Sequence, residues 1–139
     1  AFQAPEMHRQ EPYDAFLADV FQLGVILYLM AARERPWQST RPGACRRFGW
    51  FADEGHLPTS ANAPLAGSSL ALVSLLEGLL EAEPGRRLTL GEACFAEEER
   101  ESVWDAAWLG EVSKVVQRRW PCDRSVASEA SAQPVRAPI

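Results

Sequence analysis

The stretch DVFQLGVILYLMAARERPW, residues 19–37, decides how the rest of this chain can fold. From Asp19 to Ala32 only Asp19 and Gln22 carry strongly polar side chains. A helix that is apolar on every side has to be buried on every side. A bilayer span needs about 20 apolar residues, so we interpret the stretch as too short for one. It is instead predicted to be the central helix of a globular domain, running from about Phe16 or Asp19 to Ala32.

Asp19 is the second informative feature of this stretch. A carboxylate at a helix N-terminus can accept hydrogen bonds from unpaired backbone N–H groups and interacts favourably with the helix dipole. If the helix is buried, Asp19 also needs polar partners from elsewhere in the fold. The sequence therefore predicts that Asp19 holds another segment in place, with an ordinary N-cap role as the alternative.

Composition narrows the class of protein. The chain has 139 residues, of which 47% are hydrophobic and 24% charged, as is usual for one soluble globular domain. A net charge of -5 argues against a nucleic-acid partner, because such proteins usually present a basic face. The cysteines and histidines form no metal-ligand or disulfide pattern, so no metal site is expected and the histidines are placed at the surface. These residues are Cys45, Cys94, Cys122, His8 and His56.

The N-terminal residues bear on where in the cell the protein is expected. The N-terminus is polar within a few residues, which predicts no signal peptide. We expect a reducing, cytoplasmic setting with no membrane partner. Because the sequence does not begin with Met, we also expect it to be part of a longer protein.

Helix signals recur along the chain, and no strand-like alternation of any length is present. Pro5 suits the first turn of a short helix. Ser68 or Ser69 can cap a helix that continues to about Glu81, with leucines at the three-and-four spacing of one buried face. The intervening region, 38–67, is rich in Gly and Pro and is the least regular part of the chain.

Two more helices are expected around this framework. A short one over 44–51 would place two phenylalanines on one face. Thr89 and Glu92 have the spacing of a capping box, in which each residue hydrogen-bonds the backbone of the other. This signal predicts a helix from Thr89 to about Glu97.

The C-terminal third is predicted to differ from the rest. Ser102 and Asp105 form a weaker capping signal, which predicts an amphipathic helix within 99–121. Residues 122–139 are rich in Ser, Ala and Pro and are expected to be disordered. With a helical domain over 1–98, the chain as a whole is predicted to be all-α.

Four short motifs resemble, in order and spacing, the C-terminal lobe of a eukaryotic protein kinase. They match the Ala-Pro-Glu that closes the activation segment, the Asp-x-Trp-x-x-Gly of the central helix, a following Pro-Phe, and a late Asp-Pro-x-x-Arg-x-Thr. In this chain they read APE at 4–6, DVFQLG at 19–24, PW at 36–37 and EPGRRLT at 83–89. The resemblance covers about residues 1–98 and favours the serine/threonine type.

The resemblance implies structural roles for four residues and a chemical role for none. Glu6 would pair with Arg87 in a buried ion pair, which would tie the end of the activation segment to the loop before the last helix. Asp19 would hold the backbone of the catalytic loop. Gly24 would allow close packing at the middle of the central helix.

The resemblance also implies a place for a protein substrate, in a groove near Leu29, Pro36 and Trp37. Leu29 stands where several arginine-directed kinases carry a Glu, so a preference for Arg at that site is not supported. Arg33 stands where a Gly commonly ends the central helix, which predicts an altered turn before Pro36. Two milder departures are Phe21 in place of Trp and Glu83 in place of Asp.

The catalytic motifs of the family do not occur in this sequence, which contains no Gly-x-Gly-x-x-Gly and no His-Arg-Asp. No catalytic residue or cofactor is therefore assigned to the chain itself. The resemblance implies that a full-length parent, with its N-lobe and catalytic segment, uses ATP and Mg²⁺ to phosphorylate protein Ser or Thr. A pseudokinase or kinase-derived interaction module is the alternative.

The predicted C-terminal amphipathic helix has two interpretations. It can be a packed extension of the domain, or a regulatory helix read by a calmodulin-like protein. The second interpretation depends on basic and aromatic side chains, which are diluted by acidic ones. These are Trp104, Trp108, Lys114, Arg118 and Arg119.

Overall fold

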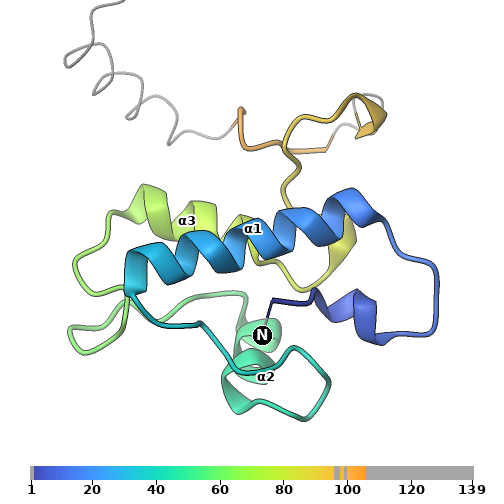
Figure 1. The fold of residues 1–139 in the computed structure, drawn as a ribbon. Coiled ribbons are helices and arrows are strands. Elements are labelled where there is room, and N and C mark those ends of the chain that lie inside the picture. The colour runs from blue at the N-terminus through green and yellow to red at the C-terminus, as the bar shows by residue number, and fades with distance from the viewer. Residues whose placement is uncertain (1, 96–97, 99, 106–139) are drawn as a thin grey trace, which may run out of the picture. The chain divides into compact units, whose positions relative to one another are not determined.

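The computed structural model describes residues 2–95, 98 and 100–105, and this part of the chain is helical (Figure 1). It contains three α-helices and three short 3₁₀ helices, with no named strand in the described part; the one bridge joins Thr89 to Ser102. The prediction of an all-α chain is confirmed for these residues. In order, the elements are η1 (Pro5–His8), α1 (Ala15–Ala32), α2 (Arg46–Glu54), α3 (Leu70–Leu79), η2 (Pro84–Arg86) and η3 (Ala93–Phe95).

The chain divides into two compact units, Ala1–Leu109 and Gly110–Ile139, and every described residue belongs to the first. The predicted amphipathic helix within 99–121 falls almost wholly outside the described residues, and the predicted disordered tail, 122–139, does so entirely. Of the predicted capping signal, the Asp105 carboxylate accepts hydrogen bonds from both the N–H and the hydroxyl of Ser102, at 3.2 and 2.7 Å.

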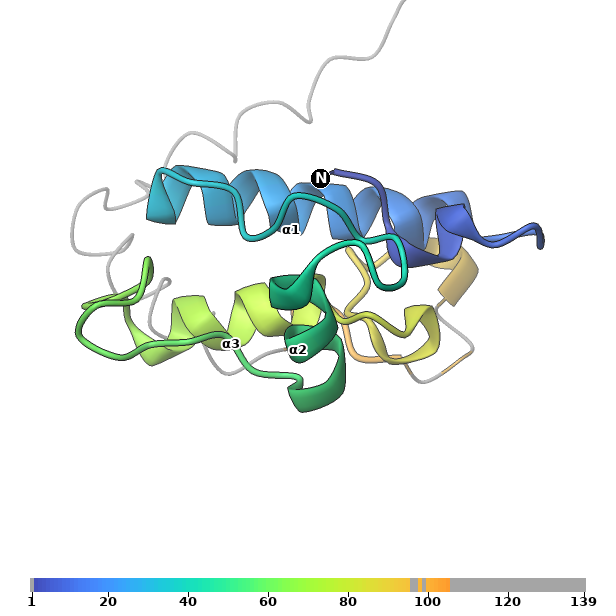
Figure 2. The same ribbon diagram turned by 90° about the horizontal axis from the view of Figure 1, so that it is seen from below.

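Helices α1 and α3 pack against each other, and α2 lies on the underside of this pair (Figures 1 and 2). The main core fills the space between these helices and the N-terminal segment, and a smaller cluster lies where α3 meets the segment after η2. Helix α3 begins after Ser69, whose hydroxyl accepts from the Leu72 N–H at 3.2 Å, so the predicted cap is confirmed. Helix α2 is confirmed as well, shifted by two to three residues toward the C-terminus.

Helix α1 begins earlier than either of the predicted starts. Its N-cap is Asp14, whose carboxylate accepts a hydrogen bond from the Leu17 N–H at 3.2 Å. Asp19 therefore lies inside the helix, and the interpretation of Asp19 as an N-cap was wrong. Asp14 and Asp19 are both acidic residues near the start of α1. The cap is Asp14, which directly precedes the helix.

Helix α1 is buried on one side only, so the prediction of burial on every side was also wrong. One row of residues at alternating spacings of three and four remains at the surface of the described structure. Its apolar members are Phe16, Leu23, Ile26 and Met30, which are 55%, 42%, 46% and 73% exposed. The reason is that α2, α3 and the N-terminal segment cover the opposite face and nothing described covers this one.

Within the described residues, α1 is the single helix that is long and apolar enough to cross a membrane by length and composition. With 18 residues it lies inside the range of about 17–25 residues that spans require, so length alone does not exclude a span as the sequence interpretation had it. A core helix of a soluble protein meets the same criterion, which makes this weak evidence.

The capping box at Thr89 and Glu92 does not form. The Glu92 carboxylate accepts from the Leu90 N–H at 2.9 Å instead of from the N–H of Thr89, which donates to the Glu101 carbonyl at 3.1 Å. Extended pairing with residues 101–103 has taken the backbone groups that a helix would need. Only the 3₁₀ turn η3 follows, so the predicted helix over the described residues 89–95 was wrong.

Gly24 lies at a close approach of α1 to α3. A Cβ atom placed on Gly24 would lie 2.9 Å from Leu79 Cβ and 3.0 Å from Leu80 Cδ2. Because Leu79 Cβ is attached to the backbone, it cannot move aside without separating the helices. We expect Gly24→Ala to lower the free energy of unfolding by about 1–3 kcal/mol, measured by urea denaturation.

Gly49→Ala provides the matched control, since Gly49 lies in α2 with nothing within 4 Å of the same added atom. This substitution should raise the free energy of unfolding by about 0.5–1 kcal/mol through helix propensity. Equal effects of the two substitutions would show that the helix crossing does not depend on Gly24.

Candidate functional site

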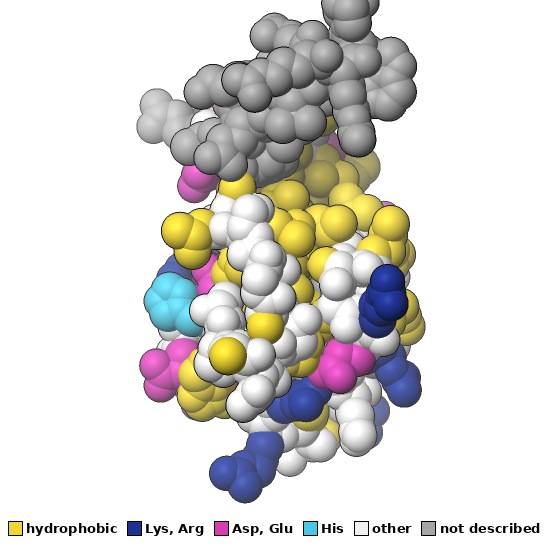
Figure 3. Space-filling view, turned by 90° about the vertical axis from the view of Figure 1, so that its left-hand side faces the viewer, with side chains coloured by type: hydrophobic (Ala, Val, Ile, Leu, Met, Phe, Trp, Pro, Cys, Tyr) yellow, Lys and Arg dark blue, Asp and Glu magenta, His cyan; other side chains and the backbone are white. Residues whose placement is uncertain are grey.

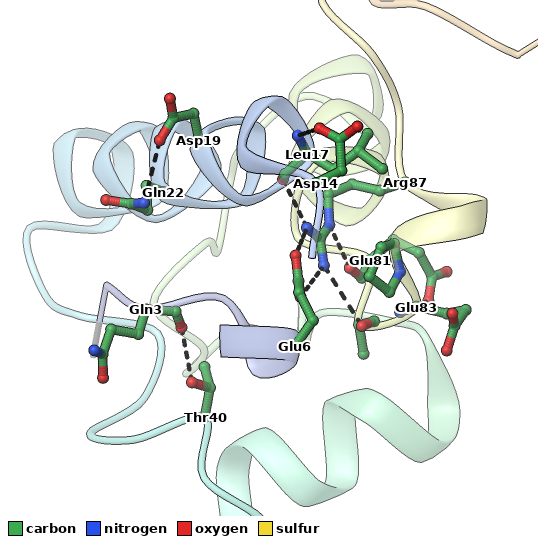
Figure 4. Close-up of polar contacts among 12 residues, drawn as sticks. Gln3, Glu6, Asp14, Leu17, Asp19, Gln22, Thr40, Glu81, Glu83 and Arg87 are labelled. Atoms are coloured by element: carbon green, nitrogen blue, oxygen red, sulfur yellow. Dashed lines mark hydrogen bonds and ion pairs between the residues drawn. The ribbon is translucent and has the colours of Figure 1, made fainter. Parts of the chain in front are cut away.

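Glu6 and Arg87 form a buried ion pair. The carboxylate and guanidinium meet through two contacts, Nη1 to Oε1 at 2.6 Å and Nη2 to Oε2 at 3.0 Å, although the residues are 81 positions apart (Figure 4). The side chains of Arg87 and Glu6 are 0% and 6% exposed. A parallel, two-contact pair of this kind is stronger and more directional than a single charged hydrogen bond.

Every N–H donor of the Arg87 guanidinium has an acceptor. Besides the two contacts to Glu6, Nη1 donates to the Leu17 carbonyl at 2.6 Å, Nε to the Glu81 carbonyl at 2.8 Å and Nη2 to the Ala82 carbonyl at 3.5 Å. An arginine has five such donors, so the charge is buried without an unmet hydrogen bond. Arg87 thereby joins η1, the first turn of α1 and the loop after α3.

The aromatic cluster beside Arg87 connects it to α2. The guanidinium carbon lies 5.0 Å from the centre of the Phe21 ring, within the range of a cation–π contact. Phe21 in turn packs on Trp37, with ring centres 5.9 Å apart, and Trp37 contacts both buried rings of α2. Phe21, which replaces the Trp expected from the resemblance, therefore serves as the link between the ion pair and the core.

Asp19 lies on the exposed face of α1, in the same row as Phe16, Leu23, Ile26 and Met30. Its carboxylate accepts a hydrogen bond from Gln22 Nε2 at 3.4 Å (Figure 4). No other segment within the described residues meets it. We call this row of five residues the α1 stripe.

The three predicted docking residues line two hollows that both border Trp37. Leu29 borders a hollow of about 880 Å³, Pro36 borders a second of about 420 Å³, and Trp37 borders both. The larger hollow is rich in arginine, and the smaller is mainly aromatic and apolar. The remaining residues of the larger hollow are Arg33, Glu34, Arg35, Gln38, Ala44, Cys45, Arg46 and Arg47.

Arg33 ends α1 in the conformation that glycine would adopt. Its φ is 58°, in the left-handed region, and its N–H donates to the Leu29 carbonyl at 2.9 Å. It is the one non-glycine residue with positive φ among those described. The departure from Gly therefore appears as backbone strain in Arg33 itself.

Two polar features of this region were not predicted from the sequence. The sequence predicted that His8 is an isolated surface residue, but it is half-buried. Its Nε2 atom lies 2.9 Å from Thr40 Oγ1. Because that hydroxyl donates to the Gln3 carbonyl at 2.7 Å, it accepts the hydrogen bond from His8 Nε2. These contacts hold the N-terminal segment against the loop after α1. No short-range sequence signal joins residues more than thirty positions apart.

Cys45 precedes α2 and lies at the edge of the arginine-rich hollow. Burial raises the pKa of its thiol, but backbone N–H groups of Phe48, Gln38, Ser39 and Arg47 outweigh burial, so that the pKa lies below its ordinary value. Cys94 is exposed. The described residues contain no group of three or more His, Cys, Asp or Glu side chains that could hold a metal ion.

The fold and these contacts describe a helical domain built around one long apolar helix and a buried arginine. Comparison with known proteins adds that it contains kinase-related sequence. The chain is 37% identical over 89 residues to the serine/threonine-protein kinase grp of Drosophila melanogaster. The matched region is 64% of this chain and only 17% of that kinase. No protein-family model matches the chain.

The Glu6–Arg87 pair predicts a large coupling in a double-mutant cycle. Either Glu6→Gln or Arg87→Met leaves a buried partner uncompensated and should lower the free energy of unfolding by about 3–5 kcal/mol. The double variant should lose less than the sum of the two. Urea denaturation of the four proteins measures this coupling.

The matched control is the pair of Arg47 and Glu34, which are 3.1 Å apart but 65% and 47% exposed. Its coupling should stay below about 1 kcal/mol. Additive effects at Glu6 and Arg87 would contradict the account of a shared buried pair.

Arg33→Gly is expected to stabilise the chain, because glycine adopts positive φ without a steric penalty from Cβ. The gain should be about 1 kcal/mol in the free energy of unfolding, measured by urea denaturation. Arg33→Ala, which keeps the strain and loses the charge, should give no such gain and serves as the control. Equal stability of the Gly and Ala variants would contradict the assignment of strain.

Proposed function

We propose that this chain is the helical C-terminal lobe of a serine/threonine protein kinase. Its full-length form would transfer the γ-phosphate of ATP, with Mg²⁺, to protein Ser or Thr. The lobe would support the catalytic segment and dock the protein substrate. The observation that carries this proposal is the Glu6–Arg87 pair, which joins the first and the last of the four kinase-like motifs. The partial match to a serine/threonine-protein kinase supports it independently.

The α1 stripe supports the role proposed for Asp19. It is a row of apolar side chains with one carboxylate, which is the surface expected of a helix whose remaining partner lies outside the described residues. A segment that covered the stripe would bury Asp19 and would have to supply hydrogen-bond donors to it. The backbone N–H groups of a catalytic loop would meet that requirement.

The test is phosphotransfer by the full-length parent protein with ATP, Mg²⁺ and a generic protein substrate. Asp19→Ala should lower kcat about 100-fold, since misplacing a catalytic loop by about 1 Å has effects of that size. The same substitution should change the free energy of unfolding of the 139-residue chain by less than about 0.5 kcal/mol, because Asp19 is exposed there. Asp53→Ala, at an exposed position of α2, is the control and should leave kcat unchanged.

The alternative function is that of an interaction module derived from a kinase. It is favoured by the two hollows that border Trp37, which could receive a partner without any catalytic residue. A parent protein that neither binds ATP nor transfers phosphate would establish this alternative. Full phosphotransfer by Asp19→Ala would instead refute the anchoring role while leaving the kinase assignment in place.

A further inference from the structure

The two hollows beside Trp37 adjoin each other and differ in chemistry. They share Trp37, Arg46 and Arg47 as common borders. On one side, four arginines and a single glutamate line the larger hollow. On the other, aromatic and apolar side chains dominate the smaller one, among them Tyr28, Trp50, Phe51 and Leu57. A ligand that spanned Trp37 would contact both.

The charge of the larger hollow is opposite to that of the chain. The whole sequence has a net charge of -5, whereas residues 33–47 contain five arginines and one acidic residue. Figure 3 looks at the end of the molecule where α1 ends, and it shows basic side chains on the lower part of that face. Arg41 belongs to segment 33–47 but does not border the larger hollow. The other four arginines of this segment line the hollow and can contact a bound ligand.

Most of these charges have no partner within the described structure. Arg47 pairs with Glu34 at 3.1 Å. The side chains of Arg33, Arg35 and Arg46 make no ion pair or hydrogen bond with any described residue. Arg33 is also held in a strained backbone conformation that glycine would relieve. Strain kept at a charged position is an observation that points to a role for the side chain.

Trp37 borders both hollows, and its ring lies where they meet. The residue is only 2% exposed, and its indole Nε1 has no hydrogen-bond partner among the described residues. A buried indole N–H usually has an acceptor. Because this atom is itself buried, a ligand in the hollows would contact the Trp37 ring and not its N–H.

From these observations we propose that the two hollows bind a peptide segment in which an anionic side chain stands next to an apolar one. The anion, a carboxylate or a phosphate, enters the arginine-lined hollow, and the apolar side chain enters the aromatic hollow. Arginine suits both anions because its planar donors match their oxygens. This inference deepens the proposed docking role, on which it rests, by naming the chemistry of the docked segment.

Charge argues for a peptide over a nucleic acid. A single anionic group meets only the local field of the arginines, and screening limits that field to about 10 Å at 0.1 M salt. A polynucleotide carries charge along its whole length and would meet the acidic remainder of the chain as well. Its binding usually requires an extended basic face, whereas this chain has a net charge of -5.

The test is fluorescence anisotropy of labelled short peptides with the complete 139-residue chain. One peptide carries Asp and Glu next to Leu, a second carries phosphoserine next to Leu, and a third has Gln and Ser in their place. The first or second peptide should bind at least tenfold more tightly than the third, and comparison of the two distinguishes carboxylate from phosphate. Equal binding of all three, or tighter binding of an oligonucleotide of equal charge, would overturn the proposal.

Variants locate the binding in the hollow. Arg35→Gln and Arg46→Gln should each weaken the acidic or phosphorylated peptide about tenfold, the usual scale of a charged hydrogen bond. Arg41→Gln removes the same charge from the same segment but outside the hollow and should have a much smaller effect. Equal losses in all three variants would reduce the site to non-specific charge attraction and contradict the proposal.

Cys45 offers a second readout because it borders the arginine-lined hollow. In a chain with Cys94→Ser and Cys122→Ser, bound peptide should slow alkylation of Cys45 by a neutral reagent at least tenfold. Unchanged alkylation at saturating peptide would place the binding elsewhere.

The peptide class and the docking role can fail separately. If the neutral peptide binds equally well and its binding is lost with Trp50→Ala, at an exposed residue that lines the aromatic hollow, docking stands and the anionic class is wrong. If no peptide binds, both the docking role and the class are wrong, whereas the kinase assignment is still judged by phosphotransfer of the parent.

Discussion

The structure depends on satisfying one buried positive charge. An unpaired guanidinium in the interior would cost several kcal/mol, and Arg87 avoids this only because five acceptors from three separate segments converge on it. Glu6 supplies two of these acceptors, and backbone carbonyls at the start of α1 and after α3 supply the rest. The same guanidinium lies over Phe21, which packs on Trp37 and so on α2. The N-terminal segment, the central helix and the loop after α3 are therefore fixed by one side chain.

Helix α1 has one face that packs on α3 and an opposite face that is largely exposed. The face that contains Gly24 packs so closely on α3 that no Cβ is accommodated. The α1 stripe on the other side leaves Phe16, Leu23, Ile26 and Met30 largely exposed around Asp19. A helix of this composition is stable as a core element when both faces are covered. We propose the stripe as the surface that the rest of a kinase would cover, and the hollows beside Trp37 as a separate surface for a ligand.

Local signals predicted local structure well. Ser69 as a cap, the helix at α2 and the turn that begins at Pro5 all depend on residues close together in sequence, and all three are present. The fold class followed from the helical periodicity. Glu6 and Arg87 were placed together only through the resemblance to a family, because no physical rule joins residues 81 positions apart in sequence.

The predictions that were wrong depended on contacts between residues far apart in sequence, which local patterns do not reveal. Thr89 and Glu92 have the spacing of a capping box, but pairing with residues near Ser102 uses the backbone groups that a helix would have needed. Burial of α1 on every side was inferred from composition, which does not reveal whether enough chain is present to cover both faces. The arginine-rich hollow was missed because its side chains are contributed by the end of α1, the following loop and the start of α2, and only the fold brings them together.

The central claim is that the α1 stripe is the surface of a kinase lobe that the remainder of the parent protein covers. Hydroxyl-radical footprinting, read by mass spectrometry, tests it by comparing the 139-residue chain with the full-length parent. The account predicts that Met30 and Phe16 are oxidised readily in the 139-residue chain and strongly protected in the parent. Trp50, which is 49% exposed on α2, should be oxidised similarly in both. Equal oxidation of Met30 and Phe16 in the two proteins would contradict the account.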